Sequence, residues 1–210
     1  MGILKGALSA RRYRVPGEVP ENFRDVYQSA LAEHAFREPL SETHKEAFSG
    51  WVRSQNLLDT DFDDLNLWLY NQYALFSLRT DKKVLPAKLF AAHLQKRCAE
   101  WCVKSGRERV PAKVKEELKE LLEQEMLQKT LPRVQVTEVV WNVAEGWLLF
   151  HSQSTNTNDN FLKLFHRTFG IALQPFDPLD FVGDQPELAA RLVSVGATDL
   201  RDLAGADHVD

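Results

Sequence analysis

Residues 134–151, VQVTEVVWNVAEGWLLFH, contain the pattern that decides the fold of this chain. Polar and apolar residues alternate from Val134 to Asn142, the stretch 144–146 (Ala-Glu-Gly) can turn the chain, and apolar residues return from Trp147 to His151. Alternation is typical of a strand with one buried face, and two such runs around a short glycine-containing turn predict a β-hairpin. An antiparallel sheet is therefore expected at the centre of the fold.

Two amphipathic helices are predicted directly before this hairpin. One runs from Pro86 to about Lys104 and is stopped by Ser105 and Gly106, and the other begins at Pro111, because glycine favours helix ends and proline favours the first helical turn. The second is expected to end near Lys129. The apolar positions at helical spacing are Phe90, Leu94, Cys98, Trp101 and Cys102 in the first helix and Val114, Leu118, Leu121 and Leu122 in the second.

Hairpins and helices also alternate in the rest of the chain. The patterns predict a strand within 7–15, a helix over 20–36, a short strand at 50–52, a hairpin over 65–79, a helix over 159–169 and a weakly helical tail over 186–203. This order predicts the α+β class, with an antiparallel sheet of hairpins covered by helices. We expect one domain over residues 1–183 and a short C-terminal tail over residues 184–210.

Composition narrows the class of protein further. With 210 residues, of which 44% are hydrophobic, the chain can bury a core of its own. It lacks both a run of roughly 18 apolar residues and a recognisable secretion signal, so we expect a cytoplasmic protein that does not enter a membrane.

Few residues are arranged as a catalytic or metal site. A glycine-rich phosphate loop, a GxSxG elbow, an HExxH motif and a CxxC motif are all absent from the sequence. Cys98 and Cys102 are expected to be reduced thiols that pack as small apolar residues. The acidic segment 59–64 (DTDFDD) has two interpretations, a solvated loop or a Mg²⁺ site of a nuclease. The loop is favoured, because no catalytic partner accompanies the aspartates at motif spacing, and we expect no cofactor, no metal and no enzymatic activity.

Charge is a stronger signal than any catalytic motif. The chain has a formal net charge of −4, yet residues 79–115 contain eleven Lys and Arg against three Asp and Glu. That region therefore carries +8, and the remainder carries −12. A segregated basic region in an acidic protein is typical of a polyanion-binding surface, because Lys and Arg that contact phosphates release counterions. A solvated helix pair that keeps the protein soluble is the alternative interpretation.

Residues 106–120 form a basic stretch rich in Lys and Glu, and Leu-Pro-Arg follows at residues 131–133. These stretches resemble the basic Lys/Glu helix, and the motif that ends it, of the RdgC family of bacterial recombination-associated DNA-binding proteins. On the N-terminal side, residues 50–52 (GWV) and 81–86 (DKKVLP) are similar to family motifs. On the C-terminal side, the hairpin over 139–150 and the helix end over 165–175 are similar as well, so the resemblance covers about residues 5–180.

The resemblance implies a duplex DNA-binding protein with little sequence preference and no catalysis. It also implies a homodimer that acts in recombination or replication on the nucleoid and restrains a recombinase of the RecA type. Full-length members have a second half that closes a ring around DNA, whereas here only residues 184–210 follow the matching region. The residues expected to contact phosphates are Arg97, Lys104, Arg107, Arg109, Lys113, Lys115 and Arg133.

Two other functions compete with DNA binding. The first is a protein-interaction or assembly subunit that kept the fold, and the second is a metal-dependent nuclease built on residues 59–64. For the expected homodimer, Trp141 and Trp147 flank one turn and suggest an apolar surface at this hairpin, although both side chains could equally belong to the core.

Overall fold

A computed structural model describes residues 8–39, 46–176, 182 and 185–194 of the protein. The chain divides into two compact units, residues 1–174 and residues 175–210. The boundary predicted from the sequence, between residues 183 and 184, lies outside the described residues.

The first unit is built on an antiparallel sheet, and the predicted α+β class is confirmed. The strands are ordered β2-β4-β5-β6-β1-β7, with β3 paired to β4. Their bounds are β1 Arg11–Arg14, β2 Phe48–Arg53, β3 Leu69–Tyr70, β4 Tyr73–Lys82, β5 Arg133–Asn142, β6 Trp147–Phe150 and β7 Gln174–Pro175. The helices of this unit are α1 Phe23–Glu33, α2 Ala87–Ser105, α3 Ala112–Lys129 and α4 Thr155–Phe169, with a 3-10 turn, η1, at Leu65–Leu67. The second unit contains α5, Pro186–Ser194.

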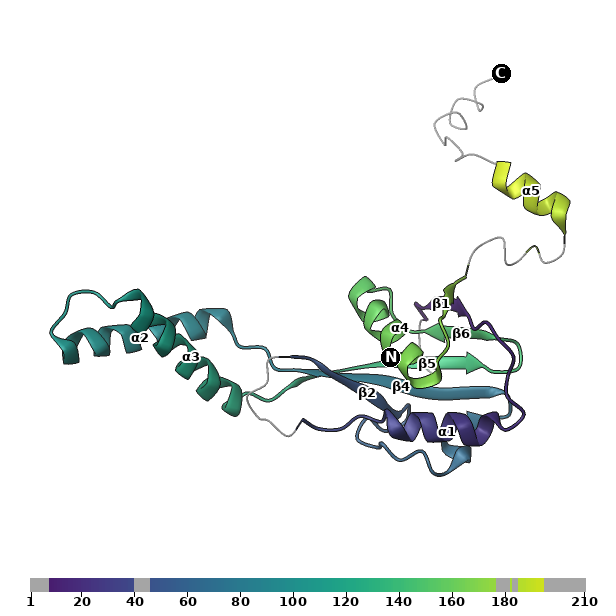
Figure 1. Ribbon diagram of the computed structural model, residues 1–210, viewed down its shortest axis with the longest axis horizontal. Coiled ribbons are helices and arrows are strands. Elements are labelled where there is room, and N and C mark those ends of the chain that lie inside the picture. Colours follow the sequence, from purple (N-terminus) through teal and green to yellow (C-terminus); the bar gives the residue numbers. More distant parts are fainter. Residues whose placement is uncertain (1–7, 40–45, 177–181, 183–184, 195–210) are drawn as a thin grey trace, which may run out of the picture. The chain divides into compact units, whose positions relative to one another are not determined.

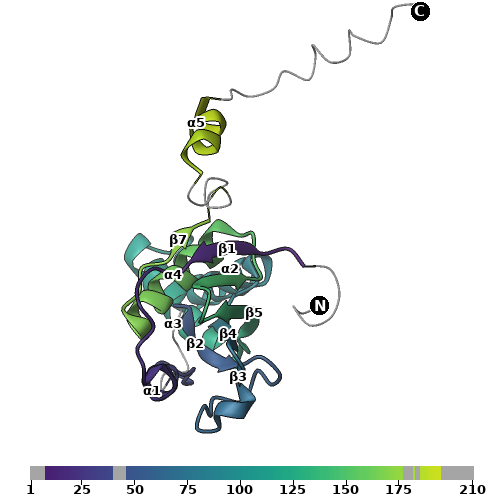
Figure 2. The same cartoon turned by 90° about the vertical axis from the view of Figure 1, so that its right-hand side faces the viewer.

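Helices α1 and α4 cover one face of the sheet (Figure 2). Side chains that point to this face form an aromatic core: Trp51 from β2, Phe76 from β4 and Trp141 from β5 are each at most 1% exposed. Helix α4 adds Phe161, whose ring stacks on Phe150 at 4.0 Å between centroids. Strands alternate and helices repeat every 3.6 residues, so each element places one apolar side in this layer, as the sequence patterns predict.

Two hydrogen bonds between buried side chains join α4 to the sheet. The Tyr13 hydroxyl donates to Asn158 Oδ1 at 2.6 Å, and the indole N–H of Trp51 donates to Thr168 Oγ1 at 2.8 Å. Burial raises the pKa of Tyr13 above its ordinary value, because the charged phenolate is disfavoured away from water. These bonds fix α4 on β1 and β2.

The predicted hairpin over residues 65–79 is only partly correct. Its second strand is present and longer than expected, because β4 continues to Lys82. Its first strand is reduced to two residues, and residues 65–67 instead form η1, whose N-cap is Asp64: the carboxylate accepts the N–H of Asn66 at 2.9 Å. The aspartate cap satisfies the backbone locally and so competes with strand pairing.

The prediction that Trp141 and Trp147 form an apolar surface at the β5–β6 hairpin is wrong for Trp141. Trp141 is 1% exposed and packs against Tyr27 and Phe165 in the core. Trp147 is half-buried beside Tyr73 and Arg12. The hairpin therefore gives no reason of its own to expect a dimer.

Helices α2 and α3 form an antiparallel pair that extends beyond the ends of β4 and β5 (Figure 1). We call α2, α3 and the connecting residues 106–111 the helical arm. The predicted stripe along α2 is only half-buried, and in α3 the fully buried apolar residues are Leu122 and Leu127. Leu121, predicted to be buried, is 54% exposed. Two helices packed only on each other cannot enclose a full core, so the apolar pattern marks a contact line there and not an interior.

The half-burial of Trp101 gives a first testable expectation. Replacing Trp101 with Ala should lower the free energy of unfolding by about 2 kcal/mol, below the roughly 3–5 kcal/mol of a fully buried tryptophan. Chemical denaturation followed by circular dichroism measures the change. Cys98→Ser and Cys102→Ser are the matched variants on the same stripe, and because both thiols are free and half-buried, these variants should leave the expected DNA binding intact. A folded Cys variant that cannot bind DNA would contradict the structural role.

Candidate nucleic-acid interface

The tip of the helical arm is a tight connection between two helix ends. Gly106 closes α2 in the left-handed conformation, with φ of +65°, and its N–H donates to the Cys102 carbonyl. Glycine suits this φ because a Cβ would be strained there. Pro111 precedes α3 directly, and no side chain caps that helix. The first N–H groups of α3 therefore leave a partial positive charge at the tip.

Five cationic side chains surround this connection. We call Lys104, Arg107, Arg109, Lys113 and Lys115 the tip cluster. All five are exposed, and none forms an ion pair or hydrogen bond through its side chain with another described residue. The structure thus brings together five of the seven residues that the sequence predicted for DNA contact.

Arg97 does not join the tip cluster. Its guanidinium pairs with Glu125 and so links the middle of α2 to α3. The hydrogen bond from Arg97 lowers the pKa of Glu125 below its ordinary value. Arg97 therefore has a structural role in the helical arm, and its charge is already partly balanced.

Arg133 lies at the opposite end of α3 from the tip cluster. It is the first residue of β5 and pairs with Lys82 of β4. An α-helix rises about 1.5 Å per residue, so the 18 residues of α3 separate Arg133 from the tip by roughly 27 Å. Arg133 thus lies in a strand at the root of the helical arm.

Two further cations of the basic region are structural. Arg79 is 6% exposed and forms a bidentate pair with Asp81, on the face of the sheet opposite α4. Lys83 donates from Nζ to the Leu127 carbonyl at 2.8 Å and so ties the end of β4 to α3. The net charge of +8 therefore overstates what residues 79–115 offer to a ligand.

Most of the chain matches a known protein family. A family model described as "Putative exonuclease, RdgC" matches residues 9–187 of the 210-residue chain. The chain belongs to the RdgC family. No curated protein matches the chain significantly. The RdgC family match confirms the resemblance read from the sequence, and two of its motifs meet in space, because Lys82 of the DKKVLP stretch pairs with Arg133 of the LPR stretch.

In this RdgC family member, aspartates of the acidic segment 59–64 form an ion pair and hydrogen bonds with nearby residues. Asp59 Oδ2 lies 2.7 Å from Arg53, and its Oδ1 accepts the N–H of Asp61. Asp61 Oδ1 in turn accepts the N–H of Asp63, and Asp64 caps η1. Among the described residues, no group of three or more potential ligands is placed to hold a metal ion. This arrangement is a chain of turns in which aspartate side chains accept backbone N–H groups.

The RdgC family member also has no candidate membrane span among its described residues, since none of its helices there has both the length and the apolar character that a bilayer crossing requires.

Proposed function

We propose that this RdgC family protein binds duplex DNA through the tip of its helical arm and contacts phosphates without reading base sequence. The observation that carries the proposal is the tip cluster: five exposed cations without ion-pair partners in the described part of the chain, gathered at the N-terminus of α3. Phosphate contacts of this kind position a protein on DNA and carry no sequence information.

The charge distribution of the helical arm supports the same proposal. The acidic residues of α3 begin at Glu116, directly after the tip cluster, and two of them have cationic partners. Arg97 pairs with Glu125, and Lys119 donates to Glu116 at 2.9 Å. A phosphate backbone at the tip would therefore meet five cations against one carboxylate of the connection, Glu108, together with the free N–H groups at the start of α3.

The decisive experiment neutralises the tip cluster. In the variant Arg107→Gln, Arg109→Gln, Lys113→Gln and Lys115→Gln, binding to all duplex sequences should weaken alike. The slope of log K against log salt should become shallower by up to about 3–4, since each lost phosphate contact contributes about 0.9. Fluorescence anisotropy with two unrelated duplexes over a salt series measures both quantities.

The matched control removes four exposed cations elsewhere: Arg24→Gln, Arg37→Gln, Arg167→Gln and Arg191→Gln. It has the same net charge as the tip variant, so it separates local contact from a general electrostatic effect. If both variants bind duplex DNA with the wild-type affinity and salt slope, the tip cluster is a solvated face or a docking site for an acidic protein. The proposal would then give way to the protein-interaction function.

The proposed function has no catalytic step. The local bonds of residues 59–64 support this part, because three of the four carboxylates, those of Asp59, Asp61 and Asp64, already accept backbone N–H groups. Incubating duplex and single strands with the pure protein and Mg²⁺ or Mn²⁺ tests it directly. Shortened strands that persist through further purification, and disappear in an Asp61→Asn and Asp63→Asn variant, would establish the nuclease alternative.

The proposal also includes a homodimer that acts at the nucleoid in recombination or replication, with a recombinase of the RecA type as partner. It rests on family membership and not on a surface of the β5–β6 hairpin. Solution mass, measured with and without duplex DNA, tests assembly and DNA binding together. A monomer at micromolar concentration in both conditions would remove the dimer.

A further inference from the structure

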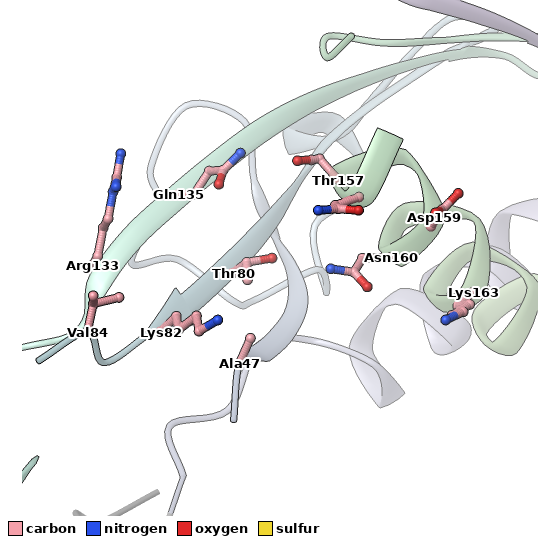
Figure 3. Close-up of a pocket in the computed structure, with 11 residues that line it drawn as sticks. Ala47, Thr80, Lys82, Val84, Arg133, Gln135, Thr157, Asp159, Asn160 and Lys163 are labelled. Carbon is pink, nitrogen blue, oxygen red and sulfur yellow. The ribbon is translucent and has the colours of Figure 1, made fainter. Parts of the chain in front are cut away.

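A cleft of about 600 Å³ lies at the root of the helical arm, where β4 and β5 extend past the N-terminal half of α4. The strands contribute Thr80, Lys82, Arg133 and Gln135, and α4 contributes Asn160 and Lys163. Figure 3 shows the strand residues on one side and the α4 residues on the other, with the Asn160 amide directed towards the strands.

The floor of this cleft continues the core face of the sheet. Along β4 the residues on that face are Phe76, Leu78, Thr80 and Lys82, so they change from buried apolar to polar to charged. Their partners on β5 change in the same direction, because Thr80 pairs with Gln135 and Lys82 pairs with Arg133. The sheet face that binds α4 in the core thus becomes a polar surface beyond it.

The pairing of Lys82 with Arg133 is unfavourable without a ligand. Like charges directly opposite each other on neighbouring strands destabilise a sheet. Neither residue forms an ion pair with another described residue. Lys163 adds a third cation from α4, and Asp159 is the one acidic side chain that lines the cleft. The lining therefore has a net charge of +2, with donors but little negative charge to balance it.

The neutral polar side chains of the cleft can donate hydrogen bonds to a phosphodiester group. Hydroxyl and amide groups of Thr80, Gln135 and Asn160 can donate hydrogen bonds to phosphate oxygens. Asn156 and Thr157, in the first turn of α4, also line the cleft, where the helix dipole favours an anion. Cations and neutral donors from the same three elements, β4, β5 and α4, therefore line one cleft.

We propose that this root cleft binds phosphodiester groups of a DNA strand and is a second DNA contact, separate from the tip cluster. The proposal rests on the proposed function and extends it: DNA held at the tip is also held at the root, about 27 Å away along α3. At 3.4 Å per base pair, that separation corresponds to roughly eight base pairs of duplex. The charge of Lys82 and Arg133 is then balanced by the bound strand.

The test compares three variants by anisotropy over a salt series with one 30-bp duplex. The root variant is Lys82→Gln, Arg133→Gln and Lys163→Gln, the tip variant is the quadruple described above, and the control is Arg24→Gln, Arg37→Gln and Arg167→Gln. The root variant should make the salt slope shallower by about 2–3, the control should change it by less than one, and the root and tip effects should add because the sites are far apart.

A single substitution keeps the test valid if the triple root variant does not fold. Lys163 is exposed on α4, so Lys163→Gln should fold normally and still make the slope shallower by about 0.9. If the tip variant loses binding while the root variant and Lys163→Gln match the control, the root cleft does not contact DNA and the proposed function stands. If wild-type protein binds no duplex at low salt, both proposals fail together.

Inorganic phosphate distinguishes a DNA contact from a site for a free anion. Amide chemical shifts of Thr80, Gln135 and Asn160 in the wild-type protein should move with duplex DNA at concentrations where inorganic phosphate, at matched ionic strength, has little effect. Movement with phosphate but not with duplex would assign the cleft to a small phosphate-bearing ligand and overturn the DNA contact.

Discussion

Asp81→Asn is expected to lower the free energy of unfolding by about 3–5 kcal/mol, because it breaks a buried ion pair and leaves one charge behind. Arg79 and Asp81 are 6% and 4% exposed, and the guanidinium donates to both carboxylate oxygens, at 2.9 and 2.7 Å. Arg79 cannot avoid this cost by losing its proton, because a guanidinium stays protonated in proteins and the Asp81 hydrogen bond raises the pKa of Arg79 further.

The remaining contacts of Arg79 cannot replace the carboxylate. One guanidinium nitrogen donates to the Leu57 carbonyl at 3.1 Å, and the group lies 4.1 Å from the centre of the Phe36 ring. Urea denaturation followed by tryptophan fluorescence measures the loss. The double variant Arg79→Met and Asp81→Leu is the control, since replacing both charges with apolar side chains should recover much of the stability. A loss below 1 kcal/mol in Asp81→Asn would show that water reaches Arg79.

Gly50→Ala should destabilise the fold by about 3 kcal/mol or more, at the upper end for overpacking. A Cβ at Gly50 would lie 2.4 Å from Phe36 Cα and 2.6 Å from Phe36 N, which are backbone atoms that cannot rotate away. The chain after α1 runs this close to β2 because it is bonded there. Phe36 N–H donates to the Trp51 carbonyl at 2.9 Å, and Trp51 N–H donates to the His34 carbonyl at 3.1 Å.

Gly106→Ala is the matched glycine control. Nothing lies within 4 Å of a Cβ at Gly106, so only its positive φ opposes alanine, at a cost of about 1–2 kcal/mol. Thermal and urea unfolding of the two variants separate a backbone clash from conformational strain. Equal stability of Gly50→Ala and Gly106→Ala would mean that the segment after α1 can move off β2 at little cost.

Much of the local structure follows from sequence periodicity. The β5–β6 hairpin, α2 and α3 appear where alternation or helical spacing predicts them. Helix α4 ends where predicted but begins four residues earlier, at Thr155, because Ser154 caps it. Gly106 ends α2 and Pro111 starts α3, because those positions depend on the backbone preferences of single residues. The misread first strand at residues 65–67 depends on a side-chain cap that competes with alternation, and periodicity alone does not reveal that competition.

The sequence predicts the tip cluster but not the pairing of the other cations. Five cations of the tip cluster lie within twelve residues of sequence, so the turn between two helices brings them together automatically. The roles of Arg79 and Arg97 depend on the acidic side chains beside them. Arg79 pairs with Asp81, two residues further along the same strand, and Arg97 pairs with Glu125 on the neighbouring helix. The sequence could not separate these paired cations from the exposed ones.

The sequence by itself determined the α+β class, the position of each long helix, the basic tip of the helical arm and membership of the RdgC family, because all of these depend on short-range patterns and ordered motifs. Tertiary structure alone decided that Trp141 is core, that Arg79 is buried, and that Lys82, Arg133 and Lys163 line one cleft. The three residues of the cleft are 30 to 81 positions apart, and only strand register and helix docking bring them to a common place.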